Sequence, residues 1–333
     1  MSHRFPVSLA TKTFRMLLDA NPGIRLDELT GDPLADLRSS SYQRVVSTYI
    51  PRPLGGPEGM RAYAAAAANY LAGIREYPTP DDLGFLKRWA SCKQVYRFGC
   101  DLADSLASSK VDAVPAEALR RMPYPIVYVD AALGGYRGFL AYAEEASGEA
   151  HSLRITFIDS DMRRYPYFLV LQDGRTLEEV RKDFRKDAEA ASLAGIHVEE
   201  DAEAKADLAF SAISLLLYIL SDNAEEEIIS APPQRRGTTR PGRKTNPETV
   251  HEMGARLGRA IGETKRGKSA DVAGLRTGRH MPPHVRAAHF THYWVGPRKG
   301  RTDGRPGDAC IVHWIPPIPV NGGGGDEVVH RAG

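Results

Sequence analysis

The sequence has few cysteines and no long apolar run. Its 333 residues include three cysteines, Cys92, Cys100 and Cys310, and no Cys-x-x-Cys pair. This excludes a disulfide scaffold, disfavours a zinc ribbon, and is typical of buried thiols in a reducing compartment. The most apolar stretch, 209–220, is shorter than the roughly 18 residues of a membrane span, and the first 13 residues lack the apolar core of a secretory signal. We therefore expect a cytoplasmic protein with no membrane segment.

Acidic residues are scarce in the C-terminal third. Residues 231–310 contain 17 Lys/Arg and 6 Asp/Glu, a balance of +11, although the whole chain carries only +2 and the remainder therefore −9. So strong a local excess favours an anionic partner, of which the phosphate backbone of a nucleic acid is the commonest. A solvated basic linker that binds nothing is the alternative.

Hydrophobic periodicity predicts an α+β fold. Helical spacing in 8–110, mainly over 10–20, 59–75 and 79–108, predicts a helical N-terminal region. Four segments then alternate with a period of two, at 126–129, 138–142, 153–158 and 167–171, and short polar connections favour a mostly antiparallel meander. Two further helices are expected to cover this sheet, at 176–193 and 202–223.

Composition suggests four successive parts. Residues 1–230 are expected to form one α+β domain, and the basic, Pro/Gly-rich segment 231–247 a linker. Asn246 and Pro247 resemble a helix start, which predicts a helix over 248–263 in a basic, His-rich C-terminal module, 248–321. The glycine run Gly322–Gly325 predicts a flexible tail over 322–333.

Histidine is concentrated in the C-terminal module. Four of the ten histidines lie within 280–292, and a fifth follows at His313. Residues 289–295 and 310–315 alternate like two strands of a hairpin whose basic loop, 296–308, could contact phosphate. We expect Arg286, Arg298, Lys299, Arg301 and Arg305 to contact RNA or phosphate, and Tyr293, Trp294 and Trp314 to stack on unpaired bases.

Other roles for these side chains remain open. The two tryptophans could instead fill the module's small core. Of the histidines, His284, His289, His292 and His313 are candidates for general acid–base chemistry, while hydrogen-bonded structural roles are the alternative. Prolines at 282 and 283 break the spacing that a helical zinc site needs, so we expect neither metal nor cofactor. Elsewhere, the pair Asp159 and Asp161 between two predicted strands is typical of turn chemistry.

The C-terminal pattern also resembles a known family. His284-x-Arg286-x-x-His289-x-x-Tyr-Trp294-x-Gly-Pro-Arg298, followed by Trp314-Ile-Pro-Pro-Ile-x-Val-Asn321, is similar to the C-terminal signature of the type V-A anti-CRISPR proteins of the second described kind, which phages and plasmids encode. The signature covers about forty residues. Over 1–230 the resemblance extends only to length and layout.

The resemblance implies a regulatory binding protein rather than an enzyme. Such proteins are thought to lower the amount of the type V-A CRISPR effector nuclease by recognising its N-terminal segment during translation, with loss of the messenger RNA. The implied partners are the nascent peptide and RNA or the ribosome. Two other hypotheses stay open: an RNA-directed nuclease or hydrolase that uses the histidines, and a non-catalytic nucleic-acid-binding accessory protein of a mobile element.

Overall fold

A computed structural model describes residues 7–30, 39–40, 80–145, 150–193, 202–230, 247–268, 284–296 and 309–320. The chain forms two compact units, each built from several segments. The sheet unit comprises Met1–Phe98, Leu119–Asp173 and Glu226–Met253, and the hairpin unit comprises Gly99–Ala118, Gly174–Glu225 and Gly254–Gly333. The units therefore interleave along the chain, unlike the predicted order of an N-terminal domain, a linker and a C-terminal module. Nearly all of the predicted linker, and the whole predicted tail, lie outside the described residues.

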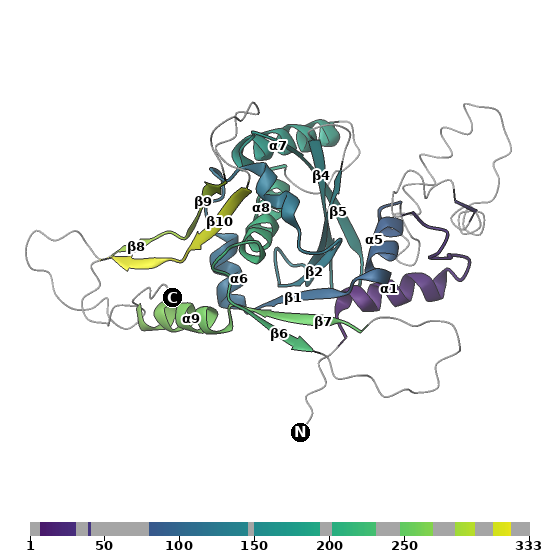
Figure 1. The fold of residues 1–333 in the computed structure, drawn as a ribbon, viewed down its shortest axis with the longest axis horizontal. Coiled ribbons are helices and arrows are strands. Elements are labelled where there is room, and N and C mark those ends of the chain that lie inside the picture. The colour runs from purple at the N-terminus through teal and green to yellow at the C-terminus, as the bar shows by residue number, and fades with distance from the viewer. Residues whose placement is uncertain are drawn as a thin grey trace, which may run out of the picture. The chain divides into compact units, whose positions relative to one another are not determined.

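The sheet unit contains a seven-stranded sheet in the order β5-β4-β3-β2-β1-β7-β6 (Figure 1). Strand β1 is parallel to both of its neighbours, β2 and β7, and all other pairs are antiparallel. The predicted α+β class with a mostly antiparallel meander is confirmed. The strands are β1 Gln94–Phe98, β2 Val127–Asp130, β3 Gly138–Glu145, β4 Ala150–Ile158, β5 Arg164–Gln172, β6 Glu226–Ser230 and β7 Thr249–Met253.

The turn between β4 and β5 has the predicted chemistry. The side chain of Asp159 accepts hydrogen bonds from the backbone N–H groups of Asp161 and Arg163, at 2.8 and 2.9 Å. Met162, between these donors, has φ 64°, the left-handed conformation that lets the chain reverse. Asp159 and Asp161 thus serve a tight turn.

Two predicted helices were wrong in part. The segment 79–108 forms α5 Pro80–Ser91, strand β1 and α6 Cys100–Ala107, while the start of 248–263 forms strand β7 before α9 Ala255–Lys268. Both missed strands are five residues long and pair with each other, with Val95 opposite Val250. The contact that makes them strands joins segments about 150 residues apart, so local periodicity could not reveal it.

Two helices cover one face of the sheet. In α1 Leu9–Ala20 and α5, apolar side chains enter a buried cluster that includes Val95, Tyr128, Leu140 and Val250 of the strands. Trp89 of α5 is fully buried there and donates its indole N–H to Thr11 Oγ1 of α1 at 3.0 Å. This shared core holds α1 and α5 against the sheet.

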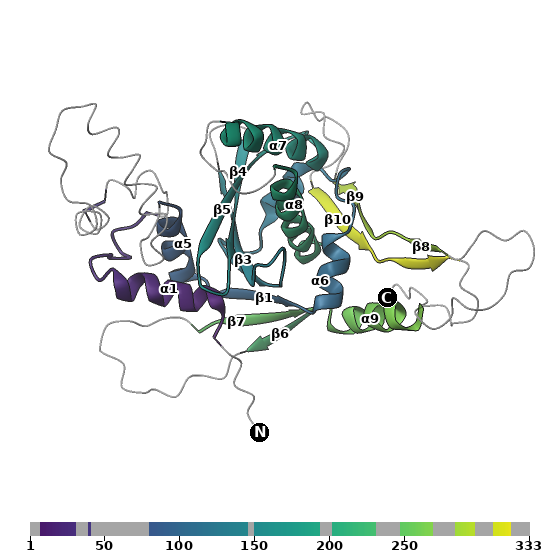
Figure 2. The same ribbon diagram turned by 180° about the vertical axis from the view of Figure 1, so that it is seen from behind.

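The hairpin unit is built around α8 Ala202–Ile219, which lies beside α6 and strand β10 in Figures 1 and 2. As its apolar centre predicted, α8 is buried almost all round. Thr176 begins α7 Leu177–Leu193 with a capping box, in which its backbone N–H donates to Glu179 Oε2 at 2.8 Å. The remaining strands are β8 His284–Arg286, β9 His289–Val295, β10 Ala309–Ile315 and β11 Ile318–Val320. The 3-10 helix η1, Ala116–Arg121, includes residues 118 and 119, between which the division of the chain into units falls.

The three thiols differ in exposure. Cys310 is buried and Cys92 half-buried, where burial raises the pKa of its thiol, whereas Cys100 at the start of α6 is exposed. The expectation of buried thiols is therefore wrong for Cys100. Within the described residues, no helix has both the length and the apolar character needed to cross a membrane.

Candidate functional site on the C-terminal strand pair

The predicted hairpin strands form as expected. Strands β9 and β10 pair in antiparallel register, with Phe290 opposite Trp314 and Thr291 opposite His313. Because side chains alternate along a strand, Phe290, Val312 and Trp314 share a buried inner face. Thr291, Tyr293 and Val295 lie on the outer face and are exposed.

Both edges of this pair are covered by segments that lie far away in the sequence. Beside β9, Phe290 N–H donates to Lys110 O at 3.0 Å, and Lys110 N–H donates to Ala288 O at 3.2 Å. Beside β10, Asp222 N–H donates to Val312 O at 3.0 Å. Part of each edge of the strand pair is therefore hydrogen-bonded to a segment outside the pair.

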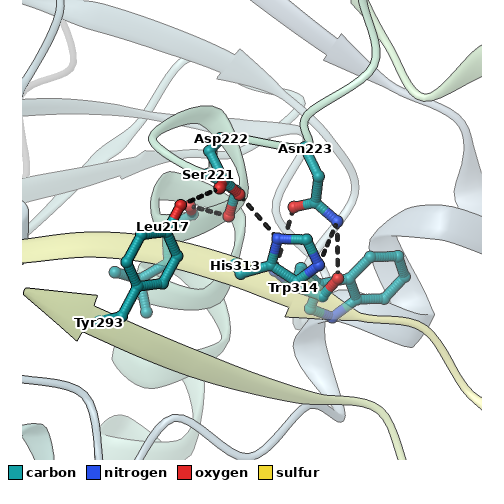
Figure 3. Close-up of polar contacts among 7 residues, drawn as sticks. All are labelled: Leu217, Ser221, Asp222, Asn223, Tyr293, His313 and Trp314. Atoms are coloured by element: carbon teal, nitrogen blue, oxygen red, sulfur yellow. Dashed lines mark hydrogen bonds and ion pairs between the residues drawn. The ribbon is translucent and has the colours of Figure 1, made fainter. Parts of the chain in front are cut away.

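Asn223 completes the edge of β10 with its side chain. Its Oδ1 accepts from Trp314 N–H at 3.1 Å and its Nδ2 donates to Trp314 O at 2.8 Å (Figure 3). The amide therefore replaces a neighbouring strand at this residue. The same Nδ2 lies 3.4 Å from His313 Nε2.

Trp314 belongs to the core of the unit. It is 0% exposed, packs edge-to-face on Tyr218 at a centroid distance of 5.5 Å, and donates its indole N–H to Ser109 Oγ at 3.0 Å. Because its ring is covered, Trp314 is not placed to stack on a base. It fills the core of the unit, which was the alternative role. Trp294 is half-buried, while Tyr293 is 46% exposed.

A polar cluster lies on the outer face of the strand pair. Figure 3 shows Tyr293 and His313 pointing toward one carboxylate, that of Asp222. The Tyr293 hydroxyl donates to Oδ2 at 2.6 Å, and His313 Nδ1 lies 2.7 Å from Oδ1. The carboxylate thus holds the proton of His313 on Nδ1, and Nε2 on the other side of the ring faces the side-chain amide of Asn223.

The cluster alters the acidity of its members. Partial burial alone would raise the pKa of Asp222, but the hydrogen bonds from Tyr293 and His313 outweigh burial and lower this pKa. The hydrogen bond to Asp222 raises the pKa of Tyr293. Asp222 is accordingly a carboxylate at neutral pH, and Tyr293 a neutral donor.

The other predicted site residues have different surroundings. His292 turns toward the inner face, where burial lowers its pKa despite the opposing charge of Glu117. His289 is on the outer face, with Nδ1 3.3 Å from Ala287 O. His284 begins β8, which pairs with β11, and Arg286 in the same strand is exposed. Four of the predicted phosphate contacts lie outside the described residues: Arg298, Lys299, Arg301 and Arg305.

A second histidine cluster lies in the sheet unit. His251 of β7 is 1% exposed, stacks on Tyr96 at 4.3 Å, and contacts Glu226 through Nδ1. Its Nε2 lies 2.7 Å from Gln94 Oε1. Both nitrogens of this buried ring therefore have hydrogen-bonding partners, which is the arrangement of a structural histidine.

Asp222, Asn223, Ser109 and Lys110 were missed as site residues from the sequence. Asp222 and Asn223 fall at the end of a predicted helix, but α8 ends at Ile219, and the segment after it lies along β10. Their partners His313 and Trp314 are about 90 residues further on. No local pattern signals such a contact, since it exists only when the chain is folded.

The fold and this surface define an α+β protein with a polar face assembled from distant segments. No group of three or more potential ligands in the described ranges could hold a metal ion. Residues 96–322 match the sequence model of the AcrVA2-like family, described as the anti-CRISPR type V subtype A2 family. The chain belongs to this family, which confirms the resemblance found in its C-terminal signature and supports an anti-CRISPR function.

Two other comparisons add context. No curated protein matches the sequence. The crystal structure of AcrVA2 is similar to this chain, with a TM-score of 0.49 and 16% identity over 95% of this chain and 100% of that one. Family membership rests on the sequence match alone.

The outer cluster predicts a pH effect on stability. Asp222 has a lower pKa in the folded protein than the roughly 3.9 of an unfolded aspartate, so its contribution is complete above about pH 4. That contribution is lost as the pH falls through the lower, folded-state pKa. We expect Asp222→Asn to flatten the dependence of Tm on pH below 4, and Tyr293→Phe to flatten it less. Melting curves from pH 2 to 7 check this, and identical slopes for all three proteins would contradict it.

Proposed function

We propose that this protein blocks type V-A CRISPR immunity by lowering the amount of the effector nuclease. It recognises the N-terminal segment of the effector as this emerges from the ribosome, and the encoding messenger RNA is lost. The observation that carries the proposal is the family match over residues 96–322, which includes the C-terminal signature.

The geometry of the hairpin unit is in keeping with this role. The signature residues His289, Trp294 and Trp314 lie on two paired strands whose edges are covered by Lys110 on one side and Asp222 on the other. A surface held in this way is preorganised, so binding does not require it to fold. The +11 balance of residues 231–310 supports RNA or the ribosome as the second partner.

Co-expression with a reporter tests the proposal. The reporter carries the first codons of the effector gene in front of a fluorescent protein, and both its transcript and its protein are measured with and without this chain. We expect both to fall. Unchanged transcript and protein levels would refute the proposal.

Two reporters separate peptide from nucleotide recognition. Synonymous recoding of the first codons keeps the peptide and changes the RNA, and we expect down-regulation to persist. Compensated frameshifts change the peptide and nearly preserve the RNA, and we expect down-regulation to disappear. The opposite pattern would assign recognition to the RNA.

A further inference from the structure

Strand β5 is an edge of the seven-stranded sheet. It ends the strand order and, among the described strands, pairs with β4 alone (Figure 2). An edge strand has a row of backbone N–H and C=O groups that face away from the sheet and can pair with another chain. Proteins usually protect such a row with charged side chains or proline, but residues 165–172 of β5 carry no charge and one proline, Pro166. The sequence of β5 therefore leaves most of this edge unprotected.

The hydrogen bonds of the preceding turn show which residues of β5 face outward. Asp159 N–H donates to Arg163 O at 3.2 Å, so the pair just before β5 is a hydrogen-bonded one. Hydrogen-bonded and non-hydrogen-bonded pairs alternate along an antiparallel ladder, which puts the even-numbered residues of β5 in non-hydrogen-bonded pairs. Pro166 is one of them, as expected for a residue without an N–H group. The N–H and C=O groups of Phe168 and Val170 therefore point away from β4, and no hydrogen bond between described residues occupies them.

The side chains of the same two residues are exposed. Phe168 is 45% and Val170 57% exposed, although both lie on the sheet face that α1 and α5 cover further along. In the row that crosses β3, β4 and β5, Tyr142 is buried, Arg154 lies next to it, and Phe168 ends the row. The edge thus offers outward backbone groups and apolar side chains at every second residue. An extended peptide with apolar side chains at alternate positions has the complementary groups.

The ring of Phe168 is held in place from one side. The guanidinium of Arg154 lies over it, 4.4 Å from the ring centroid, and Arg154 Nε is 2.8 Å from Glu144 Oε2. Glu144 in turn pairs with Arg88 of α5, at 2.9 Å. A ring fixed in this way loses little conformational freedom when a peptide packs against it.

We propose that the edge of β5 at Phe168 and Val170 is the docking site for the peptide that this protein recognises. The N-terminal segment of the effector adds to the sheet as a strand beside β5. Its backbone exchanges hydrogen bonds with the N–H and C=O groups of Phe168 and Val170, and its apolar side chains pack on theirs. This inference rests on the proposed function, because a segment that is still being synthesised is unfolded and its backbone groups are free to pair.

Fluorescence anisotropy with the purified full-length protein tests the site. The probe is a labelled synthetic peptide with the sequence that the first codons of the effector gene encode. Val170→Pro removes an outward N–H group and no hydrogen bond to β4, so we expect a folded protein that binds the peptide on the order of tenfold more weakly. Phe168→Ala removes the apolar contact and should weaken binding to a similar extent. Wild-type affinity in both variants, or no binding by the wild type, would overturn the proposal.

The opposite edge of the sheet provides a matched control. Ile228 of β6 is 60% exposed. Gly254 N–H donates to Glu225 O, so the same alternation puts Ile228, like Val170, in a non-hydrogen-bonded pair of an edge strand. We expect Ile228→Pro to bind the peptide like the wild type. Equal losses of affinity in Ile228→Pro and Val170→Pro would contradict the assignment to β5.

Pairing through the backbone has a signature of its own. N-methylation of the peptide, one residue at a time, keeps its side chains and removes single N–H groups. We expect affinity to fall at alternate residues, since only every second N–H group of an added strand faces β5. A loss that does not alternate, or no loss at any residue, would exclude strand addition.

A second copy of this chain is the other occupant to test. Pairing two β5 strands about Leu169, the centre of the exposed pair, would set Pro166 of each copy opposite Gln172 of the other, where the proline has no N–H group to donate. We therefore expect Val170→Pro to leave the oligomeric state unchanged in light scattering. A wild-type dimer that this variant converts to monomers would assign the edge to a second copy and overturn the proposal.

The cellular reporter keeps this inference separate from the proposed function. If reporter transcripts still fall when Val170→Pro is expressed as a protein that melts like the wild type, the proposed function stands and the docking site does not. If Val170→Pro abolishes peptide binding but reporter transcripts never fall even with the wild type, the docking site stands and the proposed function fails.

Discussion

Replacing Trp314 with alanine is expected to lower the free energy of unfolding by about 3–5 kcal/mol, the range for truncating a buried tryptophan. Trp314 is 0% exposed, packs edge-to-face against Tyr218 and donates to Ser109 Oγ. Its truncation leaves a cavity beside α8 and removes the donor to Ser109 Oγ, whose hydroxyl still donates to Ser105 O. Denaturant unfolding followed by circular dichroism measures the change.

Two further variants test whether Trp314 stabilises the fold by packing. Trp314→Phe keeps most of the packing and loses the N–H group, so we expect a smaller destabilisation, near 1–3 kcal/mol. Tyr293→Ala truncates an exposed aromatic on the outer face of the neighbouring strand and should alter stability far less. Equal stability of Trp314→Ala and the wild type would mean that Trp314 lies outside the core.

A second large effect is expected in the sheet unit, at the ion pair between Asp82 of α5 and Arg164 of β5. The two side chains are 3% and 7% exposed, with Oδ1 and Nε 2.7 Å apart. Asp82→Ala leaves the guanidinium buried without this carboxylate, which typically costs about 3–5 kcal/mol. Denaturant unfolding again gives the value.

An exposed pair provides the matched control for Asp82. Asp27 and Arg25 also form an ion pair, but their side chains are 70% and 61% exposed, so Asp27→Ala should scarcely change stability. Removing both buried charges, as in Asp82→Leu with Arg164→Met, should recover much of the loss, because apolar groups of similar volume can replace a buried pair. A double variant as unstable as Asp82→Ala would contradict this explanation.

The residues of the C-terminal signature are held in place by segments that lie far from them in the sequence. Residues that the C-terminal signature contains, such as His289 and Trp314, depend for their position on Lys110, Asp222 and Asn223, which lie outside it. The signature is therefore part of a larger structural unit. A C-terminal fragment beginning at 248 would lose those partners, so tests of RNA or peptide binding need the whole chain.

Two of the histidines expected on a cationic surface have other surroundings in the described part of the chain. His292 turns inward, and His313 is paired with Asp222. On the outer face Lys110 and His289 remain, and Arg286 of the neighbouring strand β8 is exposed. The basic loop residues from Arg298 to Arg305 lie outside the described residues, so their contact with phosphate stays a prediction.

The sequence by itself determined the helices and strands that have a clear hydrophobic periodicity. The meander from β2 to β5, the buried helix α8 and the pairing of β9 with β10 all follow from alternation and helical spacing within short segments. The family likewise followed from a contiguous signature.

Only the tertiary structure decided which distant segments meet. Strands β1 and β7 are too short to stand out from their helical neighbours, and they are strands because they pair with each other and with β2 and β6. The interleaved units follow from that pairing. In the same way, His313 became half of a carboxylate–imidazole pair because Asp222, 91 residues earlier, lies along β10. Local sequence restricts each residue's own backbone, whereas these contacts depend on burial and hydrogen bonding shared by the whole chain.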